Sequence, residues 1–218
     1  MTKPKKTISQ RLFEASIAIS NTLSNPAILA AVTPRGYTQA KLETALALCE
    51  EVRALTDAQQ KEYGEQHEAT ATVQKAWAEA QLPYSDALKT ARIAFRGNQS
   101  AHTSLMLGGI RKKTLNGWFD QASRFYNNLL GSAEFKAAML PYGYPQAQLE
   151  AESALVAAVK TAIDAQYKER GEAQQATKIR DAKLDELDQW LADYKKIAAI
   201  ALAGSPQQLE QLGWVVAS

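Results

Sequence analysis

Side chains that commonly perform catalysis or bind metals are scarce in this chain. Its 218 residues include two histidines, His67 and His102, and one cysteine, Cys49. A di-iron helical bundle needs a Glu-x-x-His motif on each of two helices, but Gly64 stands where that motif before His67 would need its glutamate. Cys49 lies on an apolar helical stripe, which is typical of a small core residue, and His102 lies in a polar segment that resembles a linker. We therefore expect no metal, no cofactor and no enzymatic activity.

A polar block occurs twice in the sequence, at residues 57–65 and at 164–172. One hypothesis is a polar site in the middle of a helical bundle that binds an ion or a small polar molecule. We favour a structural role, in which the two glutamines fix the helix register through buried hydrogen bonds and lysine–glutamate pairs lie on the surface. The candidate site comprises Gln59, Lys61, Glu62, Glu65, Gln166, Lys168, Glu169 and Glu172.

A basic segment at residues 108–113 separates two parts of opposite charge. The chain up to Lys113 has 15 basic and 10 acidic residues, and the remainder has 10 basic and 13 acidic residues. Cations beside two glycines can hold a phosphate, but aromatic residues do not alternate with them as in a single-strand nucleic-acid groove. We therefore favour a solvated linker and disfavour nucleic acid as a partner. The candidate anion contacts are Arg111, Lys112 and Lys113, with Lys3, Lys5 and Lys6 near the amino terminus.

The polar block belongs to a longer internal duplication. When the chain is shifted by 107 positions, residues 30–70 align with 137–177 without a gap, and 21 of the 41 pairs are identical. Shared helical composition does not produce half identity over such a length, so the sequence indicates a tandem duplication. We assign residues 7–113 to repeat 1 and residues 114–218 to repeat 2, and we expect the two repeats to pack as one fused bundle.

Hydrophobic spacing predicts the elements that position these residues. Heptad a and d positions can be followed from Leu42 to Ala80, with apolar residues at both ends and polar ones in the middle, and again from Leu149 to Leu187, where Arg170 and Arg180 interrupt them. Such spacing is typical of long coiled-coil-like helices. Pro83 is expected to kink or end its helix. The predicted helices span approximately residues 8–22, 26–32, 38–80 and 83–96 in repeat 1, and 115–129, 132–139 and 145–203 in repeat 2.

These patterns predict an all-α fold, an elongated antiparallel bundle similar to a four-helix bundle and built from two pseudo-symmetric repeats. Gly64 and Gly171 are the glycines inside the two predicted long helices, and they are equivalent under the 107-residue shift. Because glycine costs roughly 1 kcal/mol relative to alanine in a helix interior, we expect a compensating close contact. We therefore predict that the helices cross at these two residues.

Composition limits the classes of function. Hydrophobic residues make up 46% of the chain and charged residues 22%, and the net charge is +2, so a globular core is expected. A single cysteine and no apolar run of membrane-spanning length predict a cytoplasmic protein without a membrane span. We expect a structural or protein-interaction protein that binds a protein partner or associates with itself. The alternatives are a bundle that binds a small molecule or an ion, and a weak binder of nucleic acid or of an anionic surface.

The duplication predicts that neither repeat is stable alone. One long helix and two short helices leave an apolar seam without a partner. Fragments 1–113 and 114–218, expressed separately, should therefore aggregate, unfold or dimerise in sedimentation and thermal unfolding measurements. Two monomeric fragments that unfold cooperatively would contradict this dependence.

Overall fold

The computed structural model describes residues 6–214, and every regular element in that range is helical. The prediction of an all-α protein is therefore confirmed. In chain order the helices are α1 (Ile8–Ser24), α2 (Pro26–Val32), η1 (Thr33–Arg35), α3 (Gln39–Ala94), α4 (Gln99–Ser104), α5 (Leu115–Gly131), α6 (Ala133–Met139), η2 (Leu140–Tyr142), α7 (Gln146–Ala201) and α8 (Pro206–Gln211).

Within residues 6–214, no single helix is both long enough and apolar enough to span a membrane. Only α1 joined to α2 and η1 passes the same test, across a bend of 101°.

The helix bounds in the first half of the chain recur 107 residues later. Helices α5, α6, α7 and α8 begin and end 107 positions after α1, α2, α3 and α4. The long helices α3 and α7 each contain 56 residues. Before each long helix the chain turns at a glycine with positive φ, Gly36 at 86° and Gly143 at 80°, a conformation that side chains with a Cβ disfavour.

Side-chain caps define the start of α1 and the corner after it. The Thr7 hydroxyl accepts a hydrogen bond from the Gln10 amide, and the Gln10 side chain accepts one from the Thr7 amide, which forms a capping box. The Asn25 side chain then accepts from the amides at the start of α2, where Pro26 is the first residue. Proline favours the start of a helix here, because the backbone N–H that it lacks would have no partner within the helix at this position.

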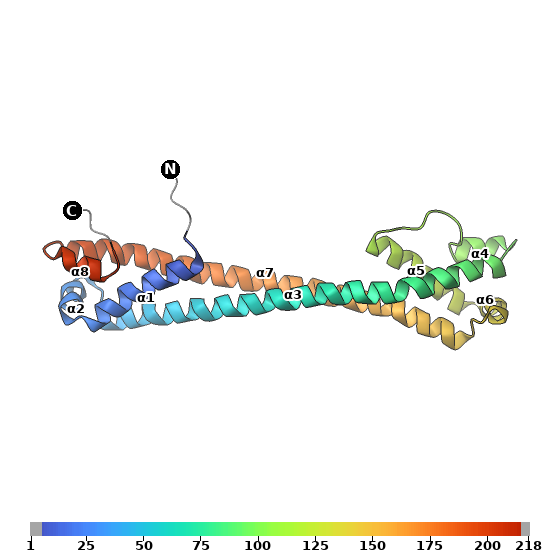
Figure 1. Ribbon diagram of the computed structural model, residues 1–218, viewed down its shortest axis with the longest axis horizontal. Coiled ribbons are helices and arrows are strands. Elements are labelled where there is room, and N and C mark those ends of the chain that lie inside the picture. The colour runs from blue at the N-terminus through green and yellow to red at the C-terminus, as the bar shows by residue number, and fades with distance from the viewer. Residues whose placement is uncertain (1–5, 215–218) are drawn as a thin grey trace. The chain divides into compact units, whose positions relative to one another are not determined.

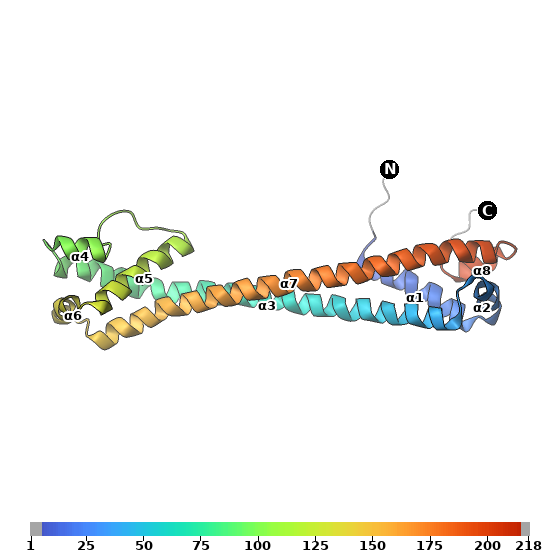
Figure 2. The ribbon, with the colours of Figure 1, turned by 180° about the vertical axis from the view of Figure 1, so that it is seen from behind.

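The structure divides into two compact units, and each takes residues from both halves of the chain. Unit 1 comprises the residues up to Tyr63 together with those from Glu172 onward, and unit 2 comprises Gly64–Gly171. In unit 1, α1, α2 and α8 lie beside the first part of α3 and the last part of α7 (Figure 1). In unit 2, α4, α5 and α6 lie beside the last part of α3 and the first part of α7 (Figure 2). The units thus divide the chain differently from the sequence repeats 7–113 and 114–218.

Within each unit, α3 and α7 pack against each other in opposite directions. In unit 1, Lys183 Nζ lies 3.3 Å from a Glu51 carboxylate oxygen. Tyr37, two residues before α3, packs against Tyr194, further along α7, with ring centroids 4.8 Å apart. The buried residues that these helices supply to the unit 1 core include Leu42, Cys49, Val52, Leu184, Leu187, Tyr194 and Ala198. In unit 2 they include Val73, Ala80, Tyr84, Leu88, Leu149, Val156 and Val159.

Pro83 does not end helix α3, which continues to Ala94. The predicted helix end at this proline is therefore wrong, whereas a kink there remains a prediction. Proline in a helix interior costs about 3 kcal/mol, and its neighbours Ala80, Tyr84 and Ala87 are buried in the unit 2 core, where packing holds the helix together. The short helices α4 and α8 were not predicted. The polar segment around His102, which forms α4, was interpreted as a linker. The other predicted helices agree with the described ones to within about two residues at each end.

The two cores differ in where they bury polar groups. In unit 2 the Tyr126 hydroxyl donates to the buried Glu152 carboxylate at 2.9 Å, and the Gln148 side chain donates to the other carboxylate oxygen at 2.7 Å. Burial raises the pKa of Tyr126 far above its ordinary value, so the phenol remains a donor. The equivalent positions in unit 1 are the apolar Ile19 and Ala45. Each core is therefore adapted to its own surroundings.

We expect Tyr126→Phe to lower the free energy of unfolding by about 1–3 kcal/mol, because it leaves one oxygen of a buried carboxylate without its donor. Urea unfolding at neutral pH measures this. Tyr142→Phe is the matched control, since Tyr142 is 49% exposed and its change should stay within about 0.5 kcal/mol. Equal effects of the two substitutions would show that the buried hydrogen bond contributes nothing.

Candidate binding groove of unit 1

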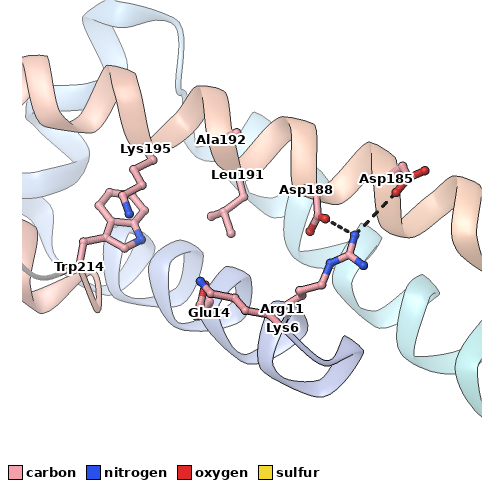
Figure 3. Close-up of a pocket in the computed structure, with 9 residues that line it drawn as sticks. All are labelled: Lys6, Arg11, Glu14, Asp185, Asp188, Leu191, Ala192, Lys195 and Trp214. Carbon is pink, nitrogen blue, oxygen red and sulfur yellow. Dashed lines mark hydrogen bonds and ion pairs between the residues drawn. The ribbon is translucent and has the colours of Figure 1, made fainter. Parts of the chain in front are cut away.

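A groove of about 600 Å³ lies between α1 and α7 in unit 1. Figure 3 shows that α1 supplies one wall, α7 supplies the other, and the Trp214 ring closes one end. Its volume falls in the range of sites that bind small molecules or short segments of a chain. The lining residues are Lys6, Arg11, Glu14, Asp185, Asp188, Leu191, Ala192, Lys195 and Trp214.

Arg11 is the central charged residue of the groove. Its guanidinium donates to the Asp188 carboxylate and lies 3.7 Å from an Asp185 oxygen, as the dashed lines in Figure 3 indicate. The Arg11 side chain is 20% exposed, whereas the Asp185 side chain is 82% exposed. The hydrogen bond to Asp188 raises the pKa of Arg11, against the opposing effect of burial. Arg11 thus joins α1 to α7, while Asp185 keeps most of its carboxylate open to solvent.

The other end of the groove combines a cation with apolar surface. Lys195 Nζ lies 5.6 Å from the centroid of the Trp214 ring, which is itself buried. Lys195 forms no ion pair with a carboxylate among residues 6–214, whereas Lys6 pairs with Glu14. Leu191 and Ala192 line the wall between the two charged ends. The groove therefore has an acidic end at Asp185, a basic end at Lys195 and apolar surface between them.

The equivalent positions in unit 2 are not lined with ions. The 107-residue shift places Trp118 at the position of Arg11, Tyr84 at that of Leu191 and Leu88 at that of Lys195. These three residues are buried, and the Tyr84 and Trp118 rings pack edge to face with centroids 5.9 Å apart. The same helical framework therefore has an apolar, filled interior in unit 2 and a charged, open groove in unit 1.

The basic segment that was predicted to be a solvated linker covers this region of unit 2. Gln121, equivalent to Glu14, donates to the Ile110 carbonyl at 3.2 Å and accepts from the Lys112 amide at 3.0 Å. The Arg111 guanidinium donates to the Met106 carbonyl at 2.8 Å, to the Gly108 carbonyl and to the Tyr84 hydroxyl. The linker interpretation is therefore wrong for the backbone of this segment.

The three candidate anion-binding residues differ in whether their side chains are already bonded within unit 2. The Arg111 guanidinium is engaged within unit 2, whereas the Lys112 and Lys113 side chains are exposed. Anion binding at these two lysines remains a prediction, and Lys3 and Lys5 lie outside the described residues.

The glutamines of the repeated polar block bond across α3 and α7. In unit 1, Arg180 Nη1 donates to the buried Gln59 side chain at 2.8 Å. In unit 2, Gln166 Nε2 donates to the Thr70 hydroxyl at 3.0 Å. Both contacts join α3 to α7, but the Gln166 bond is exposed, so the structure does not show the buried hydrogen bond that was predicted for this glutamine. Arg180 was not predicted as the partner of Gln59. Its charge at an otherwise apolar heptad position could have indicated a polar contact there.

The remaining residues of the block are divided between the two units. Lys61, Glu62 and Glu172 belong to unit 1, and Glu65, Lys168 and Glu169 belong to unit 2. Lys168 Nζ lies 3.7 Å from a Glu169 oxygen. A ligand site that combines all eight residues of the block remains a prediction.

The close helix contact predicted at Gly64 and Gly171 is not found. A Cβ added at either glycine would have no atom within 4 Å, apart from its own chain neighbours and its own helix backbone. Both positions are exposed, so steric demand does not explain the glycines. Gly117 in α5 is different, because a Cβ there would lie 2.7 Å from Cβ of Lys112.

The cysteine and histidines are placed without a catalytic arrangement among the described residues. Cys49 is fully buried, and burial raises the pKa of its thiol to about 11. Its thiolate is therefore scarce at neutral pH. His67 is exposed on α3, and His102 lies within α4.

Comparisons with known proteins do not assign this chain to a family. No protein-family model, no curated protein and no solved structure matched it.

We expect Gly64→Ala and Gly171→Ala each to raise the free energy of unfolding by up to about 1 kcal/mol, because alanine favours an exposed helix interior. Gly117→Ala is the matched comparison and should lower it, since the new methyl group would collide with Lys112. Chemical unfolding of the three variants measures these changes. Destabilisation by alanine at residues 64 and 171 would restore the prediction of a helix crossing there.

Proposed function

We propose that this chain is a non-enzymatic protein-interaction protein whose unit 1 groove binds a segment of a partner protein. The observation that carries this proposal is the difference between equivalent places in the two units. In unit 2, residues 110–112 of the chain itself bond to Gln121 and Tyr84, at positions equivalent to walls of the unit 1 groove. The counterpart segment in unit 1, residues 3–5, lies outside the described residues. A framework that holds a peptide segment in one copy is suited to hold one in the other.

The residues of the groove support a protein partner. Tryptophan and arginine are enriched among residues that contribute most to protein–protein binding, and Trp214 and Arg11 line this groove. Apolar surface at Leu191 lies between charged residues, which matches an interface with an apolar centre and a polar rim.

The proposed scaffold for this interaction is a tandem duplication in which each repeat supplies parts of both units. The identity over residues 30–70 and 137–177 supports this proposal, as do the helix bounds that recur after 107 positions. The long helices α3 and α7 would then act as coiled-coil-like supports in each unit, in the manner of an antiparallel helical bundle. Because one repeat cannot complete a unit, the scaffold and the groove depend on the whole chain.

Site-specific photocrosslinking tests the proposed function. The photoreactive residue p-benzoylphenylalanine is introduced at Ala192, which lines the groove and is exposed, and in a matched control at Ala199, which is exposed on α7 outside it. We expect crosslinking in cells at position 192 but not at 199. The double variant Asp185→Lys with Lys195→Glu should abolish it. Mass spectrometry then distinguishes another protein from a second copy of this chain. Crosslinking that is equal at both positions, or that the double variant leaves unchanged, would contradict the proposal.

A further inference from the structure

Unit 2 holds its own segment mainly by the backbone. The Gln121 side chain bonds to the carbonyl of Ile110 and to the amide of Lys112, two residues apart on the same segment. Ile110 itself is 88% exposed, so its side chain contributes little to this contact. A side-chain amide that bonds to main-chain groups of residues i and i+2 recognises an irregular or extended chain, in which successive side chains alternate in direction.

Unit 1 has the same wall positions with charged side chains in place of neutral ones. Glu14 stands at the position of Gln121, and Lys195 stands at the position of Leu88. The Glu14 carboxylate pairs with Lys6, and it cannot donate to a peptide carbonyl as the Gln121 amide does. The unit 1 groove therefore suits a segment that carries charges of its own.

The open charges of the groove define the order of charges on such a segment. Asp185 is 82% exposed, and Arg11 is shared between it and Asp188, so the Asp185 end attracts a cation. Lys195 lies beside the Trp214 ring without a carboxylate partner in the described chain, so its end attracts an anion. The two residues are ten positions apart on α7, about 15 Å at ~1.5 Å per residue. An extended peptide covers that distance with about four to five residues at ~3.3 Å each.

We infer that the unit 1 groove recognises a short extended peptide segment with a basic residue at one end, an acidic residue at the other and apolar residues between. The basic residue pairs with Asp185, the acidic residue pairs with Lys195, and the apolar residues contact Leu191 and Trp214. This inference rests on the proposed protein-interaction function and adds the chemistry of the partner segment.

Two capped, fluorescein-labelled pentapeptides serve as probes for this inference. One has the sequence Lys-Leu-Ser-Leu-Glu and the other Lys-Leu-Ser-Leu-Lys, so they differ only in the charge of the last residue. Fluorescence anisotropy with the full chain should give saturable binding and a preference for the first peptide, which carries both charges. Equal affinity for both peptides, or no saturable binding of either, would overturn the inference.

Charge reversal in the groove gives the sharper test. Asp185→Lys and Lys195→Glu should each weaken binding of the preferred peptide by about tenfold, because each replaces an attraction with a repulsion. The Lys195→Glu variant should prefer the second peptide, since both ends of its groove are then acidic. Lys178→Glu is the matched control, because Lys178 is exposed on α7 and does not line the groove. A Lys195→Glu variant that keeps the parent's preference would overturn the inference.

The two experiments separate the inference from the proposed function. If crosslinking at position 192 depends on the groove but neither peptide binds, the partner is recognised by another chemistry and the inference fails alone. If crosslinking at 192 is also absent, the protein-interaction function fails with it. Thermal unfolding of each variant should resemble that of the parent, because residues 178, 185 and 195 are all exposed.

Discussion

The antiparallel packing of α3 against α7 is the interaction on which both units depend. Each long helix supplies one part to each unit, so neither core can form from one repeat. A narrow apolar stripe on a long helix stabilises the fold only when another helix covers it. The bonds of Arg180 to Gln59 and of Gln166 to Thr70 fix this packing in the two units. The helices α1 and α5 can then pack against a defined surface.

The unit 1 groove results from different side chains at equivalent helix positions of the two units. Trp118 fills the unit 2 position at which unit 1 has Arg11, and burial of a large aromatic residue stabilises unit 2. Ion pairs that are partly exposed contribute only about 0–1 kcal/mol, so the charged walls of unit 1 add little stability. Their value on the present account is recognition of a partner segment. Under the proposed function, unit 1 would bind the partner and unit 2 would add stability.

The helical class and the helix bounds could be predicted from the sequence because heptad spacing and caps are local signals. A helix end at Pro83 was expected because the cost of proline is local, whereas the packing of Tyr84 that offsets this cost is tertiary. Gly64 and Gly171 were misjudged for the opposite reason, since a helix glycine suggests a close contact that the fold does not make.

The groove itself was not predicted. Its walls come from α1 and α7, and Arg11 and Asp188 are 177 positions apart in the chain. No motif joins such residues, and only the fold brings them together. The sequence did contain one indication of the groove. When the 107-residue shift is continued past residue 177, the apolar Leu88 aligns with the charged Lys195. A change from an apolar to a charged residue between repeats indicates that the second position is no longer buried.

Chemical crosslinking of cysteine pairs across α3 and α7 tests the central claim most directly. In a Cys49→Ala background, Glu51→Cys with Lys183→Cys reports on unit 1, and Thr70→Cys with Gln166→Cys reports on unit 2. A short bismaleimide at low protein concentration should join both pairs within one chain. A control pair displaced along α7, Glu51→Cys with Lys196→Cys, should remain unlinked. Products that join two chains, or no product in either unit, would contradict a fold in which each chain completes both units by pairing its own α3 and α7.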